Sequence, residues 1–328
     1  MTATDLAYVR YQVTDLDRAA GFMTDFGLSV AERTSTHLYL RGASSVSYIY
    51  VAELGSDNRF LGAGFHVDAP AALARLASLP GSTAIEPVSG PGGGLRVRMT
   101  MPDGVEIDAV HGASPAPALP VRAANRFNNG EAKPRVNACV RQRTEAVPVL
   151  RLGHFVLHVR DHEASVAWIG ERLGLLASDW LATPAAPDRP IGTFMRLDCG
   201  EKLVDHHCLF IIQADRPGVH HCSFEVQDLD HLMAAHDYLF AKGYRLDCGV
   251  GRHMLGSQVF DYWRDAFGFR VEHYTDGDIV NHEHRPGTFT GTADQTTQWG
   301  ARPPLEFFDL ADHDATRPFH PSLSGIPS

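Results

Sequence analysis

The chain has no arrangement of cysteines suited to cross-linking or to thiolate metal binding. Its five cysteines are an odd number and include no CxxC pair, which argues against a disulfide framework and a zinc–thiolate cluster. No apolar stretch approaches the roughly 20 residues of a membrane-spanning helix, and residues 1–6 lack the charged-then-apolar pattern of a secretory signal. We therefore expect reduced cysteines, a cytoplasmic location and no membrane association.

Positive charge is also scarce in this sequence. The 29 lysines and arginines are outnumbered by 39 acidic residues, and the formal net charge is -10. Because no run of basic residues is present either, we do not expect the protein to bind nucleic acid. The composition is 44% hydrophobic and 21% charged, which is typical of a globular protein, and a length of 328 residues favours two domains.

The two halves of the chain resemble each other. An alternating strand that ends in aspartate occurs at 7–15 and again at 153–161, and a helical pattern follows each one. This long-period repeat predicts an α+β fold of two domains, each built from two β-α-β-β-β modules. Further matching segments are 64–67 with 223–226, and 104–109 with 268–274.

Composition also suggests where the domains begin and end. A stretch rich in proline and asparagine reads as a connector, and the C-terminal residues, rich in glycine, proline, aspartate and histidine, read as an irregular tail. The tail contains Trp299, Phe307 and Phe308, which could anchor it or form a lid over a pocket. The expected divisions are a domain at 1–113, a connector at 114–150, a second domain at 151–275 and the tail at 276–328.

Three polar residues in the second half stand out because of the strands that carry them. Side chains on a strand alternate between two faces. In their segments, His154, His221 and Glu272 each fall opposite the apolar set, so all three lie on the face that a pocket would use. The same parity prefers His221 over His220, which shares its side with Cys222.

Two imidazoles and one carboxylate form a facial triad, which holds a non-haem Fe(II) and leaves positions open for substrate and oxygen. A single histidine on a strand is more often a hydrogen-bonded structural residue. With 18 histidines in the chain, some also align by chance. Convergence of the three side chains therefore depends on the fold.

The motifs around these residues extend the pattern. They are a His-His pair on a strand, an Arg-His in a loop, a tyrosine three residues before an Asp-x-x-Gly turn, and a glutamate soon after. Here these occupy residues 220–221, 252–253, 262, 265–268 and 272. In these features the chain resembles the type I extradiol ring-cleaving dioxygenases of the vicinal oxygen chelate superfamily, most densely from Leu152 to Asp278.

The resemblance implies roles for individual residues. It makes His154, His221 and Glu272 the ligands of Fe(II), with Mn(II) as the alternative, since both accept this set. It makes His253 and Tyr262 the groups that hydrogen-bond the substrate oxygens. The pocket histidine on the oxygen side matches His206, although parity does not separate it from its neighbour at position 207.

The N-terminal half departs from this pattern, and so does one turn. The positions that correspond to the three ligands are Tyr8, Gly62 and Asp108, so the first domain resembles the degenerate, non-catalytic domain of the family. The family's turn usually has proline after aspartate, but this chain has Ala266. Because proline presets a turn, we expect that corner to be looser.

The resemblance implies an enzyme that cleaves a catechol ring beside the diol and inserts both atoms of O2. Its partners would be a catechol and O2, and it would form a homo-oligomer. A metal-dependent isomerase or lyase of the glyoxalase-like fold is the first alternative. A non-catalytic small-molecule-binding protein of that fold is the second, and it would lack a complete metal set in both halves.

Overall fold

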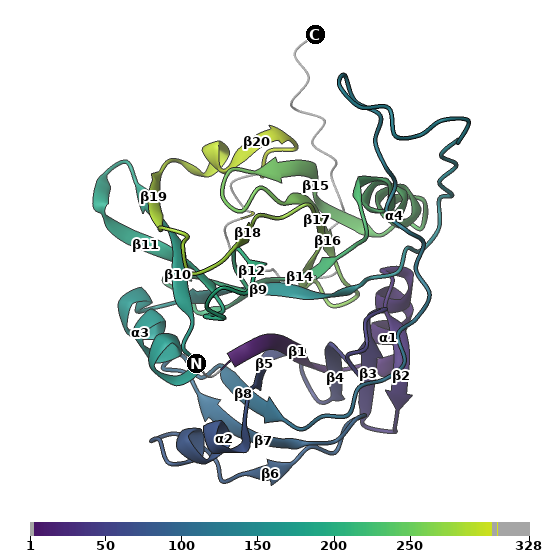
Figure 1. The fold of residues 1–328 in the computed structure, drawn as a ribbon. Helices are drawn as coiled ribbons and strands as arrows, with labels where there is room; N and C mark the ends of the chain where they lie inside the picture. Colours follow the sequence, from purple (N-terminus) through teal and green to yellow (C-terminus); the bar gives the residue numbers. More distant parts are fainter. Residues whose placement is uncertain (1–2, 304–306, 308–328) are drawn as a thin grey trace.

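The computed structural model describes residues 3–303 and Phe307, so Phe308 and the rest of the expected tail lie outside the described residues. The chain forms two large mixed sheets with four helices (Figure 1). Within the described part of the chain, no helix has both the length and the apolar character needed to cross a bilayer.

The first half forms an eight-stranded sheet in the order β2-β3-β4-β1-β5-β8-β7-β6. It contains two β-α-β-β-β modules, whose first strands β1 and β5 pair antiparallel at the centre. The first module comprises β1 (Ala3–Val13), α1 (Leu16–Asp25), β2 (Ser29–Arg33), β3 (His37–Arg41) and β4 (Tyr50–Leu54). The second comprises β5 (Arg59–Val67), α2 (Pro70–Ala77), β6 (Glu86–Pro87), β7 (Leu95–Thr100) and β8 (Glu106–His111).

The second half repeats this order. Its ten-stranded sheet runs β19-β10-β11-β13-β9-β14-β17-β16-β15-β20, so the same arrangement lies between two added edge strands. One module comprises β9 (Arg151–Val159), α3 (His162–Leu173), β10 (Leu176–Thr183), β11 (Ala186–Arg196) and β13 (Leu209–Gln213). The other comprises β14 (Gly218–Glu225), α4 (Leu229–Ala241), β15 (Arg245–His253), β16 (Val259–Arg264) and β17 (Arg270–Thr275). The predicted α+β fold of four modules is confirmed.

The C-terminal segment is more regular than its composition predicted. It contains β18 (Ile279–Val280), β19 (Gly287–Thr290), a 3-10 turn (Ala293–Thr296) and β20 (Thr297–Gly300). Short β12 (Val204–Asp205) pairs with β18, while β19 and β20 extend the large sheet at both edges. Composition missed these strands because their backbone hydrogen bonds come from distant partners rather than from local propensity.

Aspartates at the ends of the leading strands begin the helices. The Asp15 carboxylate accepts hydrogen bonds from the backbone N–H groups of Asp17 and Arg18, and Asp161 accepts one from Ala164. These side chains satisfy N–H groups that a helix leaves unpaired at its start. The repeated strand–aspartate pattern in the sequence is therefore a repeated helix N-cap.

The two halves share one hydrophobic core, in which β9 and β14 lie over β1 and β5 (Figure 1). The Tyr11 and Phe269 ring centroids lie 4.7 Å apart, and the His273 ring stacks on Phe26 at 3.7 Å. The first domain thus covers one face of the central strands of the second. The opposite face of those strands is left for polar residues.

The N-terminal position corresponding to the glutamate ligand is filled by an ion-pair cluster. Asp108 is fully buried; Arg10 Nη1 donates to it at 3.1 Å and Arg98 Nε at 2.8 Å. The Tyr8 hydroxyl donates to the same carboxylate at 2.9 Å. The guanidinium groups of the arginines therefore balance this carboxylate, and no metal ion is needed there.

We expect Asp108→Asn to destabilise the protein by about 3 kcal/mol, because it removes the carboxylate that buried Arg10 and half-buried Arg98 share. Chemical denaturation followed by tryptophan fluorescence measures this change. Asp57→Asn, at an exposed carboxylate of the same half, is the matched control and should shift stability by less than about 0.5 kcal/mol. Equal effects of the two substitutions would contradict this account of the cluster.

Candidate metal centre and cavity

His154, His221 and Glu272 come together on the free face of three neighbouring strands, β9, β14 and β17. His154 Nε2 lies 3.2 Å and His221 Nε2 3.4 Å from Glu272 Oε2. The two Nε2 atoms are themselves 3.3 Å apart. One donor atom from each residue therefore faces a common point, which is the convergence that the sequence could not establish.

The Glu272 carboxylate is buried without a hydrogen-bond donor among the described residues. Its side chain is fully buried, and neither of its oxygens accepts a hydrogen bond among the described residues. A buried carboxylate without donors is strongly destabilising. A divalent cation bound by Glu272 and the two Nε2 atoms would remove this cost, so the donor set fits Fe(II) or Mn(II).

The electrostatics of the cluster favour the protonation states that bind metal. Burial raises the pKa of Glu272, but contacts with the imidazoles of His154 and His221 outweigh burial and hold that pKa well below its usual range. Burial lowers the pKa of His221 to about 4. Near neutral pH, the site therefore presents a carboxylate and an unprotonated imidazole, the forms that coordinate cations.

His220 does not lie where strand parity placed it. The register between β14 and β9 shifts between Val219 and His221, and this bulge turns both histidines toward the same cavity. His220 Nδ1 lies 2.6 Å from His221 Nδ1. The expectation that His220 shares the apolar side is therefore wrong, and His220 instead contacts the nitrogen of His221 that faces away from Glu272.

A cavity of about 780 Å³, including its mouth, opens beside the three residues. Arginine, lysine, aspartate and glutamate are absent from its described lining. Beyond the histidines, the walls are mainly apolar and include Leu181, Phe194, Phe210, Ile212, Phe289 and Phe307.

His253 and Tyr262 lie together at the cavity, as the sequence suggested. His253 Nε2 is 2.7 Å from the Tyr262 hydroxyl and 3.6 Å from Glu272 Oε1. Burial raises the pKa of Tyr262 well above its usual value, and the charge of Glu272 adds to this effect. The hydroxyl therefore keeps its proton and can donate a hydrogen bond to a ligand oxygen.

The sequence resemblance favoured His206 as the pocket histidine, but the structure arranges the two histidines the other way. His207 lines the cavity, with its ring centroid 4.3 Å from that of His154. His206 faces away from the cavity, and its Nε2 lies 2.9 Å from Asp179 Oδ2. The geometry therefore favours His207 as the pocket histidine.

Some residues of the site were not identified from the sequence. Arg270 is almost fully buried, bonds Asp247, and lies with its guanidinium 4.1 Å from the centre of the Phe307 ring. Parity could have indicated Arg270, since it shares a strand face with Glu272. The wall residue Phe307 carried no such signal, because a tail far from the ligand strands supplies it.

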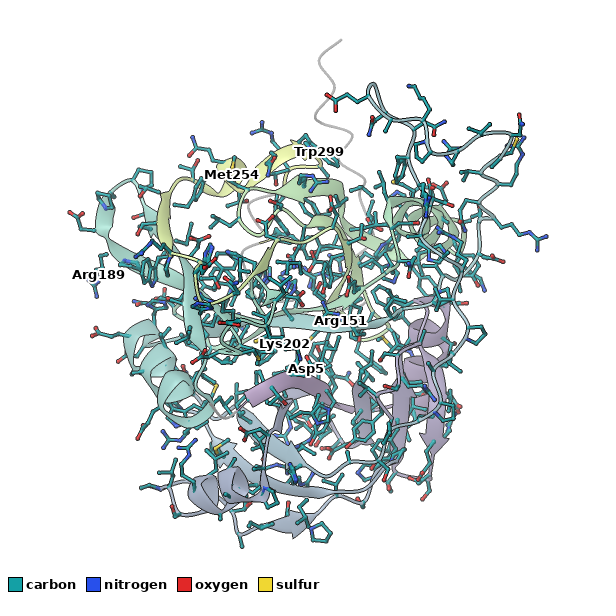
Figure 2. The ribbon with its side chains drawn as sticks, in the orientation of Figure 1. Asp5, Arg151, Arg189, Lys202, Met254 and Trp299 are labelled. Atoms are coloured by element: carbon teal, nitrogen blue, oxygen red, sulfur yellow. The ribbon has the colours of Figure 1, made fainter. Side chains whose placement is uncertain are left out.

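The aromatic residues of the tail divide between two roles. Phe307 is buried in the cavity wall. Trp299 is 47% exposed and stands over Arg252, away from the lining, and Figure 2 shows it on β20 beside Met254, which does line the cavity. Of the proposed lid residues, only Phe307 is placed to cover a ligand within the described residues.

The turn that lacks proline is well ordered by other contacts. The Asp265 carboxylate accepts hydrogen bonds from the backbone N–H groups of Phe267 and Phe269, at 2.8 and 2.9 Å. These bonds restrain the corner without the proline ring.

Comparison with known proteins gives consistent likenesses. Residues 151–273 match the model of the Glyoxalase/Bleomycin resistance protein/Dioxygenase superfamily. The chain is 27% identical to metapyrocatechase 2 of Cupriavidus necator over 90% of this chain and 88% of that protein. It is 28% identical to biphenyl-2,3-diol 1,2-dioxygenase of Paraburkholderia xenovorans strain LB400, over 83% of this chain and 88% of that one.

Solved structures show the same fold. A Mn(II)-bound glyoxalase from Novosphingobium aromaticivorans superimposes with a TM-score of 0.76 at 22% identity, covering 94% of each chain. Homoprotocatechuate 2,3-dioxygenase from Arthrobacter globiformis gives a TM-score of 0.76 at 20% identity, over 94% of this chain and 91% of that one. At these identities, the likeness establishes the fold.

We expect His221→Ala to abolish stoichiometric metal binding, because it removes one of three ligands. His220→Ala should lower the affinity for the metal by about 10- to 100-fold, because it removes only the group that orients His221. Metal titration after anaerobic loading measures both effects. His37→Ala, in the N-terminal sheet, is the control and should bind metal normally. Full metal retention in the His221 variant would contradict the assignment.

Proposed function

We propose that this protein is an extradiol catechol dioxygenase. Residues 151–273 match the model of the Glyoxalase/Bleomycin resistance protein/Dioxygenase superfamily, and most of the chain is similar to a metapyrocatechase and a biphenyl-2,3-diol 1,2-dioxygenase. The observation that carries the proposal is the orphaned, fully buried Glu272 facing two imidazole nitrogens at the floor of an apolar cavity. The reaction would open the ring beside the diol and insert both atoms of O2.

We assign the metal to His154, His221 and Glu272, with Fe(II) as the active ion and Mn(II) as the alternative. When bound there, Fe(II) would hold both catechol oxygens and pass electron density to O2, chemistry that side chains cannot supply. A single carboxylate in the cluster favours this function over a glyoxalase-like isomerase, which commonly completes its metal shell with further carboxylates.

The remaining polar groups would position the substrate and move protons. The Tyr262 hydroxyl keeps its proton and would donate to a catechol oxygen, while His253, in contact with that hydroxyl, would take up a substrate proton. His207 faces the cavity beside His154 and would exchange protons on the oxygen side. The apolar walls would exclude bulk water and so strengthen each of these polar contacts.

The cavity also favours a substrate class. Its described lining offers no cation to pair with a carboxylate on the substrate, and burying an unpaired carboxylate costs several kcal/mol. Alkyl or aryl substituents would instead pack against Leu181, Phe210 and Phe289. We therefore assign an uncharged, apolar-substituted catechol as the substrate.

The reaction class can be tested by oxygen stoichiometry. The Fe(II)-loaded protein should consume one O2 per catechol and yield a yellow, ring-opened product. Oxidation to Fe(III) should abolish turnover, and a reductant should restore it. A 1,4-diol should not react, because only adjacent hydroxyls can reach one metal. Full turnover of a substrate under strict anaerobiosis would instead identify an isomerase or lyase.

Measurements of kcat can distinguish the roles of His206 and His207. His207→Phe should keep its iron and lose at least about 100-fold in kcat, the range associated with loss of a general acid–base. His206→Phe should lose about tenfold, because His206 acts on the cavity only through its neighbour. Steady-state kinetics on proteins of equal iron content measure both. The reverse order of effects would return the pocket role to His206.

Substrate preference provides a further test. We expect kcat/KM for 3-methylcatechol or 3-phenylcatechol to exceed that for 3,4-dihydroxyphenylacetate by at least about 100-fold, which corresponds to about 3 kcal/mol for an unpaired carboxylate. Competition assays at equal iron loading give this ratio directly. A preference for the anionic catechol would refute the apolar assignment while leaving the reaction class intact.

A further inference from the structure

A second cluster of metal-binding residue types lies behind the cavity. It consists of Asp179 on β10, His206 between β12 and β13, and His284 between β18 and β19. One potential ligand atom from each lies within 4.8 Å of the others. None of the three lines the cavity, so this cluster is separate from the ligands assigned above.

The geometry of the second cluster resembles that of the first. The rings of His206 and His284 have centroids 5.9 Å apart at an interplanar angle of 82°; the corresponding values for His154 and His221 are 5.5 Å and 78°. His206 Nε2 lies 2.9 Å from its carboxylate oxygen, compared with 3.2 Å for His154 Nε2. Both clusters therefore present two nearly perpendicular imidazoles and one carboxylate.

Each residue of the second cluster is also held by its other polar atom. Asp179 Oδ1 accepts a hydrogen bond from the Gly287 backbone N–H at 2.7 Å. His284 Nε2 donates to the Ser178 carbonyl at 2.9 Å, which leaves its Nδ1 as an acceptor. His206 Nδ1 lies 3.1 Å from His207 Nδ1. Histidines that bind metals characteristically have such a partner on the second nitrogen, because it fixes the tautomer and the ring orientation.

The charge and burial of the cluster also suit a cation. His206 is buried, and its Nε2 faces the carboxylate of Asp179. Arg196, the neighbouring cation, is bonded to the Ala177 carbonyl and Ser178 Oγ rather than to Asp179. Two imidazoles and one carboxylate can supply three ligands to a divalent ion and leave a fourth position for water, an arrangement that Zn²⁺ commonly adopts.

We propose that Asp179, His206 and His284 form a second divalent-cation site, with Zn²⁺ as the best-fitting ion. Such an ion would join β10 to the segments that carry His206 and His284. Coordination through Nε2 of His206 would place the proton of that ring on Nδ1, where it donates to His207. His207 would then carry its own proton on Nε2. The second ion would thereby set which tautomer His207 presents to the cavity.

The test uses a full-length background in which the first site is disabled, His221→Ala with Glu272→Ala. This protein should bind one Zn²⁺ per chain at micromolar concentrations, measured by isothermal titration calorimetry. Co²⁺ in its place should give the intense visible bands of a tetrahedral ion. Adding His284→Ala or Asp179→Asn should weaken binding by at least about 100-fold.

His282→Ala is the matched control, because this exposed histidine lies two residues from His284 on the same segment. It should leave Zn²⁺ binding unchanged. Absence of stoichiometric Zn²⁺ binding in the disabled background would overturn the proposal and reduce the cluster to hydrogen bonds that position His207. Binding that survives both His284→Ala and Asp179→Asn would overturn it as well. Since none of these measurements uses catechol or O2, their failure is distinguishable from failure of the dioxygenase assignment.

Discussion

The structure of the C-terminal half depends on the position of one carboxylate. Glu272 is fully buried at the centre of a large sheet, and no backbone N–H of the described residues donates to it. Its close polar neighbours among the described residues include the imidazoles of His154, His221 and His253 and the Tyr262 hydroxyl. A negative charge in such surroundings is tolerated only with a compensating positive charge. The fold therefore places a buried negative charge beside the cavity, where a bound cation would neutralise it.

The pairing of strands explains why three distant residues meet there. β9 and β17 both pair with β14, so residues separated by more than 50 positions in the sequence become neighbours across the sheet. The shared hydrophobic core fixes the opposite face of these strands, where Phe155, Cys222 and Val271 are fully buried. Figure 2 shows Arg151, at the start of β9, at the junction between the halves. Packing against the first domain thus fixes the strands that carry His154, His221 and Glu272.

Strand periodicity was sufficient to predict part of this site. Phe155 and Val271 are buried in the core, and His154 and Glu272 face the other way. This holds because β17 keeps a regular register with β14 and the bulge in β9 lies before His154. Periodicity failed at His220, since a bulge in β14 adds one residue to the strand and reverses the alternation locally. A bulge depends on the register of the partner strand, and a single sequence does not specify that register.

The four-module α+β fold was predictable because both halves of the sequence repeat the same pattern of strands and helices. The helix N-caps also recur, at Asp15 and Asp161. Other features arise only from tertiary contacts. The choice between His206 and His207 depends on how a short connection between β12 and β13 meets Asp179, and no local pattern encodes that contact. The edge strands β19 and β20 likewise exist because an existing sheet offers them unpaired backbone groups.

In the first domain, the corresponding buried carboxylate is neutralised in another way. Asp108 pairs across β5 and β8 with Gly64, as Glu272 pairs with Ser223 across β14 and β17. Both carboxylates are fully buried. At Asp108, however, the guanidinium groups of Arg10 and Arg98 supply the positive charge and fill the space. A guanidinium has no open coordination position, so this solution stabilises a sheet without creating a reactive centre. The two buried carboxylates therefore differ in that guanidinium groups balance Asp108, whereas Glu272 faces only uncharged or weakly basic groups among its described neighbours.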